Sequence, residues 1–203
     1  RNRGWREARG HYVGYLDDDA IAPAGWLSLA ERIIEERRPA AFGGPFYPFY
    51  LTAKPVWFKD AYGARELGER SGVLEGEETL SGGNFFVRRE IVERLGGFDP
   101  RLGMSGRAMG YGEETEFQWR LRREMPEAII YYHPELRIQH LVWPAKMRLT
   151  NRLKQALTQG RDNWTAERSL GKFPPAGRLR TLRAMATESL KIAWMLTAGA
   201  WLR

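Results

Sequence analysis

Three consecutive carboxylates follow an apolar run in "YVGYLDDDAIAPAGWL", a pattern that could bind a metal ion. Asp17, Asp18 and Asp19 repel one another, so a positive group is expected beside them. The two outer carboxylates can reach a hard divalent cation such as Mg²⁺ or Mn²⁺. A helix N-terminal cap with a solvated turn before Pro23 is the alternative that these residues leave open.

Two other acidic loops fit this stretch poorly. An EF-hand requires a glycine and a distal glutamate at positions where this sequence lacks them. Phosphoaspartate hydrolases need a hydroxyl residue where Ile21 stands. Both classes are therefore disfavoured.

A second acidic cluster, Glu113 and Glu114 with Glu116 close behind, starts a predicted helix. Neighbouring helical side chains point about 100° apart, so one of the first two carboxylates can face a pocket while the other pairs outward. The glycine-rich approach over 103–112 allows the backbone to come close to a ligand. Favourable interaction with the helix dipole is the simpler explanation for acids at this place.

Strands and helices alternate around these clusters. The acids at 17–19 follow the strand "HYVGYL", and ligands bind at the C-terminal ends of strands in open α/β sheets. Residues 47–78 have no clear period and predict a long excursion with a short helix. The predicted strands are 11–16, 40–42, 84–87, "AIIYYH" and "LRIQHLVW", and the predicted helices are 1–9, 22–38, 89–95 and one from about 113.

The C-terminal third is basic and helical in pattern. Residues 137–203 carry a net charge of +10, whereas the whole chain carries +7. A helix after Pro144 is expected, then the linker "GKFPPAG" and a final helix over 179–202. We expect two domains, a catalytic portion over 1–145 and a helical extension over 146–203. The first of these helices has an apolar face formed by Met147, Leu149, Leu153, Ala156 and Leu157, and a basic face formed by Lys146, Arg148, Arg152 and Lys154.

Composition narrows the class of protein. The 203 residues are 43% hydrophobic, enough for a core, and include no cysteine, which excludes disulfides and thiolate metal ligands. No run is long and apolar enough to span a membrane. Without a basic-aromatic RNA motif or zinc-finger spacing, no nucleic-acid partner is expected. We expect a soluble, cytoplasmic protein with peripheral contact to a membrane.

Three motifs in combination give a specific resemblance. "RNRGWREARGHYVGYLDDDAIAPAGWL", "LSGGNFFVRREIVERLGGFDPRL" and "GYGEETEFQWRLRR" occur in the order and approximate spacing of family 2 glycosyltransferases. The resemblance extends from Arg1 to about Arg123. It implies the GT-A fold, an α/β fold with a mixed sheet.

The resemblance also implies an activity. Family members invert the anomeric centre while moving a sugar from a nucleoside diphosphate donor to an acceptor hydroxyl, here on a glycan or a lipid-linked acceptor, with Mn²⁺ or Mg²⁺. Asp19 resembles the direct metal ligand of the D-x-D element, and Asp17 or Asp18 is expected to reach the ribose or the metal shell. Glu114 stands at the place of the catalytic base and Glu113 at that of its preceding acid. Many members have Asp where this chain has Glu114.

Further positions carry expected roles by the same resemblance. Arg1 and Asn2 match an "ARN" motif that holds the nucleotide or its phosphates, and Gly82, Gly83 and Asn84 match a loop beside the donor sugar. His140 resembles a histidine near the metal or diphosphate, although a packing role is the alternative. Arg120 matches a motif arginine or serves as a structural ion-pair partner.

Two expectations concern what lies beyond these motifs. The family's N-terminal βαβ half, which reads the base, has no counterpart in this sequence. A rival function is a non-catalytic surface protein whose C-terminal helices dock on an anionic membrane or a partner and whose acidic clusters are structural.

Overall fold

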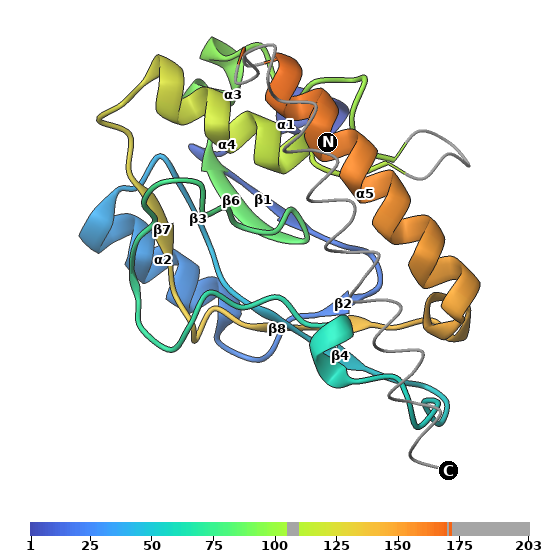
Figure 1. Cartoon of the computed structure of the whole chain (residues 1–203). Coiled ribbons are helices and arrows are strands. Elements are labelled where there is room, and N and C mark those ends of the chain that lie inside the picture. The colour runs from blue at the N-terminus through green and yellow to red at the C-terminus, as the bar shows by residue number, and fades with distance from the viewer. Residues whose placement is uncertain (105–109, 170, 172–203) are drawn as a thin grey trace.

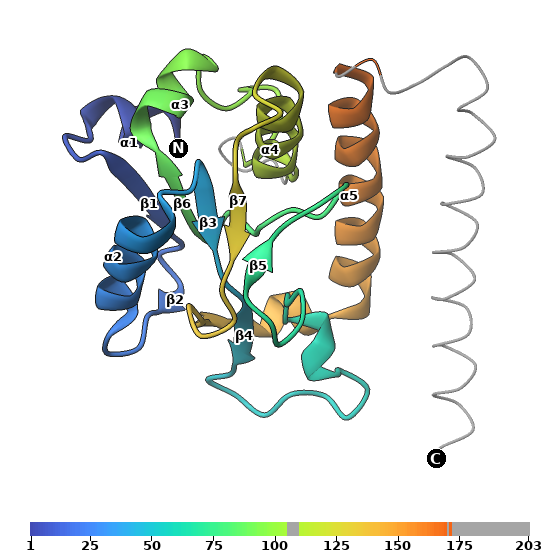
Figure 2. The same ribbon diagram turned by 90° about the vertical axis from the view of Figure 1, so that its left-hand side faces the viewer.

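The computed structural model describes residues 1–104, 110–169 and 171, in which two β-sheets lie among packed helices (Figure 1). The larger sheet has the order β1-β6-β3-β7-β5, and Figure 2 shows these strands side by side. Its strands are β1 Tyr12–Leu16, β6 Asn84–Arg88, β3 Ala41–Gly43, β7 Ile130–Tyr132 and β5 Gly72–Val73. The smaller sheet has the order β2-β8-β4, formed by β2 Ala20–Ile21, β8 Ile138–Leu141 and β4 Phe46–Phe49.

Both sheets are mixed. The β3–β7 and β4–β8 pairs are parallel, and the β1–β6, β3–β6, β5–β7 and β2–β8 pairs are antiparallel. The predicted α/β class with a mixed sheet is confirmed. The sequence did not predict β2, β4 or β5, because strands of two to four residues are too short to show an alternating pattern.

Helices cover both faces of the larger sheet. Figure 1 shows α4 and α3 above it and α2 below it, while α5 runs along one side. The α-helices are α1 Asn2–Glu7, α2 Trp26–Arg37, α3 Arg89–Arg94, α4 Glu113–Glu124 and α5 Leu149–Ser169, and two 3₁₀ turns are η1 Asp60–Tyr62 and η2 Pro144–Met147.

Strand β6 is the centre of the core because both of its faces are covered. Phe85 and Val87 pack with Phe117 and Leu121 of α4, while Phe86 on the opposite face packs against α2. A strand buried on both faces reads as a continuous apolar run, as "FFV" does here. Helix α2 contributes Trp26, Leu29, Ala30 and Ile33, which lie at helical spacing on its buried side.

Asn84 joins three segments at the start of β6. Its side chain is fully buried, and its amide nitrogen donates to the backbone oxygens of Pro45 and Leu136. Its amide oxygen accepts a hydrogen bond of 3.2 Å from Trp26 Nε1. Asn84 therefore ties β6 to α2 and to the two loops that lead into the smaller sheet.

Helix α5 packs beside α4 at its C-terminal half. Asp162 is 5% exposed, and its Oδ2 accepts the backbone N–H of Tyr111 at 2.8 Å. The predicted apolar stripe is buried at Met147, but Leu149 and Leu157 are 39% and 67% exposed. The predicted linker at 171–177, apart from Gly171, and the final helix at 179–202 lie outside the described residues. In the described part of the chain, none of the helices is long and apolar enough to cross a bilayer.

Replacing Asn84 by alanine should lower the free energy of unfolding by about 3 kcal/mol, because one buried donor and two buried acceptors lose their partners. Urea unfolding followed by circular dichroism measures the change. Asn163→Ala is the matched control, since Asn163 is exposed on α5 and its loss should change stability by less than about 0.5 kcal/mol. Equal effects in the two variants would contradict the role given to Asn84.

Candidate active site

Asp17, Asp19 and His140 converge at one end of β1. The Nε2 atom of His140 lies 3.4 Å from Asp17 Oδ2 and 3.1 Å from Asp19 Oδ1. One ligand atom from each of the three residues lies within 4.8 Å of the other two. The structure thus brings together the three residues that the sequence suggested as metal ligands.

Strand register produces this convergence. Asp17 follows the last residue of β1, and Ala20 in β2 pairs with His140 in β8. The backbone N–H of Leu141 donates to the backbone oxygen of Asp19 at 2.9 Å, which fixes the acidic turn against β8. Asp18 is exposed, because it lies at the outside of the turn that the hydrogen bond from the Ala20 N–H to Asp17 O closes.

The remaining oxygen of Asp19 is held by two residues that the sequence reading did not place in the site. Trp143 Nε1 donates to Asp19 Oδ2 at 3.1 Å, and Lys146 Nζ lies 3.4 Å from the same atom. We expected Lys146 on the basic face of a helix, but it lies in the 3₁₀ turn η2, which eclipses side chains three residues apart. His140 lies in a strand, Trp143 at a cap and Lys146 in a 3₁₀ turn, so no single period in the sequence indicates that they converge.

The environment of Asp17 favours its charged form. The hydrogen bond from His140 is the main cause of an Asp17 pKa below its ordinary value, and the charges of Arg1 and Lys146 act in the same direction against the effect of burial. An ionised carboxylate is the form that binds a metal. Two carboxylate oxygens and one imidazole nitrogen suit Mn²⁺ and leave positions for water or a phosphate.

The second acidic pair faces Arg1. Gly112, with a φ of +83°, ends the loop in the left-handed region and starts α4 directly at Glu113 and Glu114. The Arg1 guanidinium forms ion pairs with both, at 3.2 Å to Glu114 Oε2 and more closely to Glu113. Burial raises the pKa of Glu113, an effect that Arg1 opposes and Glu114 reinforces.

A glycine turn lies between the two acidic groups. A Cβ at Gly83 would overlap the Asp17 carboxylate, and one at Gly82 would overlap the Arg1 guanidinium. The backbone N–H of Asp17 donates to Gly83 O at 3.4 Å. The absence of side chains at these two positions therefore lets Asp17 and Arg1 occupy neighbouring space.

Gln118 fixes this turn to α4, a role that the sequence reading missed. Its fully buried amide accepts from the N–H of Leu80 at 2.8 Å and donates to the oxygen of Leu80 at 3.1 Å. It also donates to Glu114 O at 3.0 Å. A single glutamine in an amphipathic helix gives no sequence signal for such a contact.

Three predicted site residues serve the fold instead of facing the acidic groups. Asn84 is buried as described, and Asn2 exchanges two hydrogen bonds with the backbone of Phe98, at 2.8 and 2.9 Å. Trp5 Nε1 donates to the same oxygen of Asn2 at 3.1 Å. Arg120 pairs with the buried Glu116 through two contacts of 2.8 and 3.0 Å, the structural alternative for that arginine.

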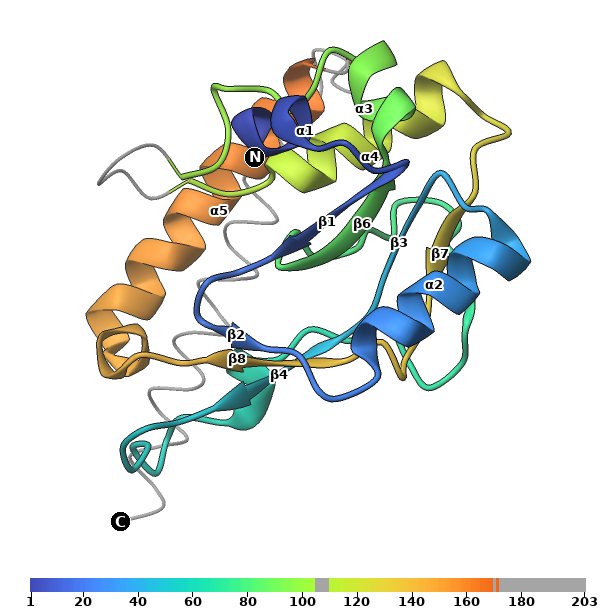
Figure 3. The ribbon, with the colours of Figure 1, turned by 180° about the vertical axis from the view of Figure 1, so that it is seen from behind.

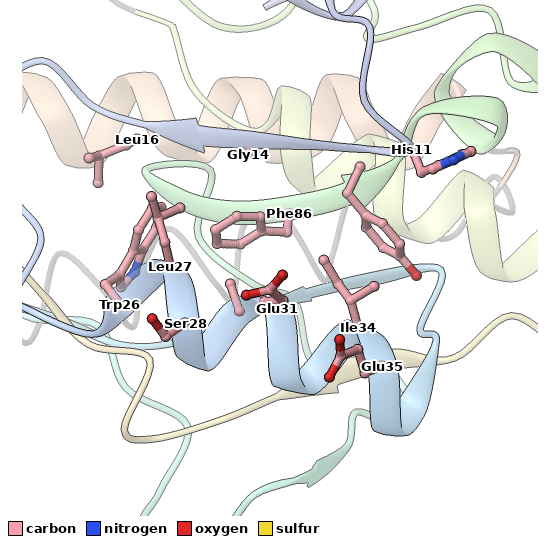
Figure 4. A pocket seen from close by; sticks show the side chains of 12 residues that line it. His11, Gly14, Leu16, Trp26, Leu27, Ser28, Glu31, Ile34, Glu35 and Phe86 are labelled. Carbon is pink, nitrogen blue, oxygen red and sulfur yellow. The ribbon is translucent and has the colours of Figure 1, made fainter.

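A hollow of about 810 Å³ lies elsewhere, between α2 and strand β1 (Figure 4). Trp26, Leu27, Glu31 and Phe86 line it, together with residues of β1, and none of the converging carboxylates does. Figure 3 shows that this is the outer edge of the larger sheet, where β1 has no further partner strand among the described residues. The acidic groups lie at the end of β1 rather than along it.

Comparisons with known proteins concern the family and the fold of the chain. Residues 1–96 match the family model described as glycosyl transferase family 2. The chain is 27% identical over 145 residues to the glucosyl-dolichyl phosphate glucuronosyltransferase of Haloferax volcanii. The aligned region covers 69% of this chain and 46% of that protein. The chain therefore spans about half the length of this curated relative.

Two solved structures share the fold. The mannosyltransferase PcManGT from Pyrobaculum calidifontis, in complex with GDP-Man and Mn²⁺, aligns with a TM-score of 0.51 and 18% identity over 99% of this chain and 58% of that chain. GalNAc-T7 with UDP, GalNAc and Mn²⁺ aligns with a TM-score of 0.50 and 17% identity over 79% of this chain and 31% of that chain. At such identities the likeness shows the fold, which is GT-A.

Asp17→Asn and Asp19→Asn should each weaken Mn²⁺ binding by at least roughly tenfold, because each removes one charged ligand of the triad. Isothermal titration with Mn²⁺ measures the change. Asp18→Asn removes the same charge from an exposed neighbour and should change affinity by less than about threefold. Similar losses of Mn²⁺ affinity in all three variants would show that only the net charge matters, which would contradict a defined metal site.

Gly83→Ala should weaken Mn²⁺ binding by roughly tenfold, because the new methyl group must displace the Asp17 carboxylate. Gly72→Ala is the matched control, since a Cβ there meets open space. Both variants should remain folded by circular dichroism. Unchanged affinity in Gly83→Ala would show that Asp17 does not depend on this contact.

Proposed function

We propose that the chain, which matches the glycosyl transferase family 2 model over residues 1–96 and has the GT-A fold, is a member of that family and catalyses an inverting sugar transfer. The donor is a nucleoside diphosphate sugar and the acceptor is a hydroxyl group. The observation that carries the proposal is the convergence of Asp17, Asp19 and His140 beside a second acidic pair held by Arg1. A sugar bound between them would have the metal triad on one side and the acidic pair on the other.

The triad supports the leaving-group side of the reaction. Asp17, Asp19 and His140 would hold a divalent cation, which when bound neutralises the charge of the departing diphosphate. Trp143 and Lys146 fix the orientation of Asp19 through its second oxygen. Both structural relatives contain Mn²⁺ with a nucleotide or nucleotide sugar, which favours Mn²⁺ as the ion to test first.

Glu114 is the proposed catalytic base. It lies in the first turn of α4, where its carboxylate is about one-fifth exposed and accessible to an acceptor hydroxyl. In the transfer, this carboxylate takes the hydroxyl proton while the acceptor oxygen forms a bond to the anomeric carbon and the bond to the diphosphate breaks. Attack from the side opposite the diphosphate inverts the anomeric configuration.

Glu113 and Arg1 position the base. Arg1 contacts both carboxylates, and its guanidinium also lies 5.9 Å from the centre of the Phe98 ring. A charge-assisted contact between Arg1 and a donor phosphate agrees with the predicted role of this residue. Gly82 and Gly83 allow Arg1 and Asp17 to lie directly against the glycine turn, beside which the donor sugar is proposed to bind.

The acceptor is proposed as a sugar on a lipid carrier. The curated relative is named a glucosyl-dolichyl phosphate glucuronosyltransferase, so its name specifies a lipid-linked acceptor. The acceptor class proposed for this chain follows from that relationship. Titration with nucleoside diphosphates identifies the base of the donor.

Titrating UDP, GDP and dTDP into the protein, with and without Mn²⁺, tests the donor site. We expect one nucleotide to bind in a Mn²⁺-dependent manner, and we expect Asp19→Ala to abolish that binding. Transfer measured with the matching nucleotide sugar tests the chemistry, and Glu114→Gln should lower kcat by roughly 10²–10⁴-fold with the donor affinity nearly unchanged.

Glu113→Gln is the matched comparison, because it removes the same charge from the neighbouring position. A larger fall of kcat in Glu113→Gln than in Glu114→Gln would assign the base to Glu113 instead. Normal turnover in both variants would contradict a role for this acidic pair in proton transfer.

A further inference from the structure

The loop over residues 50–59 exposes large apolar side chains. Leu51 is 70% exposed, Val56 is fully exposed and Trp57 is 42% exposed. Figure 2 shows this loop below both sheets, projecting away from the body of the molecule. Apolar side chains that cluster on a surface commonly mark a site of interaction with a partner or a membrane.

The loop is anchored at its base while its tip faces outward. Phe58 is 2% exposed and packs with Val142 and Met147 in a small apolar cluster. The Phe58 ring also meets Tyr50 and Tyr62 edge-on, with centroids 6.3 and 5.6 Å away. A fixed root of this kind holds the apolar tip outside the core.

A second segment extends this surface. A hollow of about 480 Å³ lies between the loop and residues 144–150, with Pro55 and Trp57 on one side and Arg148 and Leu149 on the other. Leu149 is 39% exposed, so the exposed apolar side chains continue from the loop onto the start of α5. The loop 50–59 and residues 144–150 together form a surface that we call the docking face.

The charge of the docking face is of one sign. It includes Lys54, Lys59, Lys146 and Arg148 and no Asp or Glu. Lys54 is paired with Asp60, the acid that follows the loop, and Lys146 with Asp19, while Lys59 and Arg148 are exposed. A protein interface usually has few lysines at its core, whereas apolar tips surrounded by cations suit the headgroup region of an anionic bilayer.

We propose that the docking face binds the surface of an anionic membrane, with Leu51, Val56 and Trp57 entering the headgroup boundary and Lys59 and Arg148 contacting lipid phosphates. A tryptophan at this depth places its ring where aromatic residues gather in membrane proteins. The docking does not depend on the proposed sugar transfer. This proposal differs from docking through the C-terminal helices, because most residues of the docking face lie in the loop 50–59.

The position of the docking face links it to the candidate active site. Its anchors Val142 and Met147 belong to the same segment as His140, Trp143 and Lys146. If the proposed function holds, the metal triad therefore lies beside the membrane, where a lipid-linked acceptor presents its sugar.

A single fluorescent label tests the proposal, because the chain contains no cysteine. Val56→Cys and Leu27→Cys would each carry an environment-sensitive NBD group, and Leu27, 68% exposed on α2, is the matched control. Adding POPC vesicles that contain POPG should shift the emission at position 56 to the blue and leave position 27 unchanged. POPC alone should cause a much smaller shift.

Vesicle sedimentation of the full chain tests the charges. Lys59→Glu with Arg148→Glu should reduce partitioning onto POPG-containing vesicles by at least roughly tenfold. Arg32→Glu with Arg37→Glu makes the same change in net charge on exposed positions of α2 and should reduce it much less.

Three results would overturn the proposal. They are an unshifted label at position 56, an equal shift at position 27, and equal partitioning losses in the two double variants. A label at position 56 that responds to protein concentration without vesicles would assign the face to a second copy of the chain instead. Turnover of a soluble acceptor, measured separately, distinguishes failure of docking from failure of the proposed transfer.

Discussion

Strand register determines where the three residues of the metal triad lie. In β1 and β6, Leu16 faces Asn84, so the residues that follow β1 and precede β6 meet at one end of the sheet. In β2 and β8, Ala20 faces His140, so the histidine reaches the same end from the other side. A shift of one residue would turn each side chain to the opposite face, so the metal triad depends on both registers at once.

The arrangement of charge follows from that geometry. Asp17, Asp19, Glu113 and Glu114 lie in one region, and such a concentration of carboxylates requires cations near it. Arg1 joins the two glutamates, and Lys146 lies at Asp19. Both cations are carried by long side chains, which can follow a phosphate group without moving the backbone.

Much of the fold could be predicted from the sequence, because strands such as β6 and helices such as α2 have clear apolar patterns. The smaller sheet could not, since β2 has only two residues and its pairing with β8 spans most of the chain. The amides of Asn2 and Asn84 show a further limit. The sequence motifs predicted that these amides bind the donor, but the packed structure shows that their hydrogen-bond partners are backbone groups of the protein. Trp143 and Lys146 were missed because the sequence predicted a strand end at Trp143 and an α-helix at Lys146, whereas the 3₁₀ turn that follows Trp143 brings both side chains to Asp19.

The bond between Gln118 and Leu80 has a consequence for motion. One side-chain amide binds both polar backbone groups of Leu80 and also the backbone oxygen of Glu114. The segment that leads into the glycine turn and the first turn of α4 are thus linked through one buried side chain and should move together. A movement that separated Leu80 from α4 would have to break both of its hydrogen bonds to the Gln118 amide.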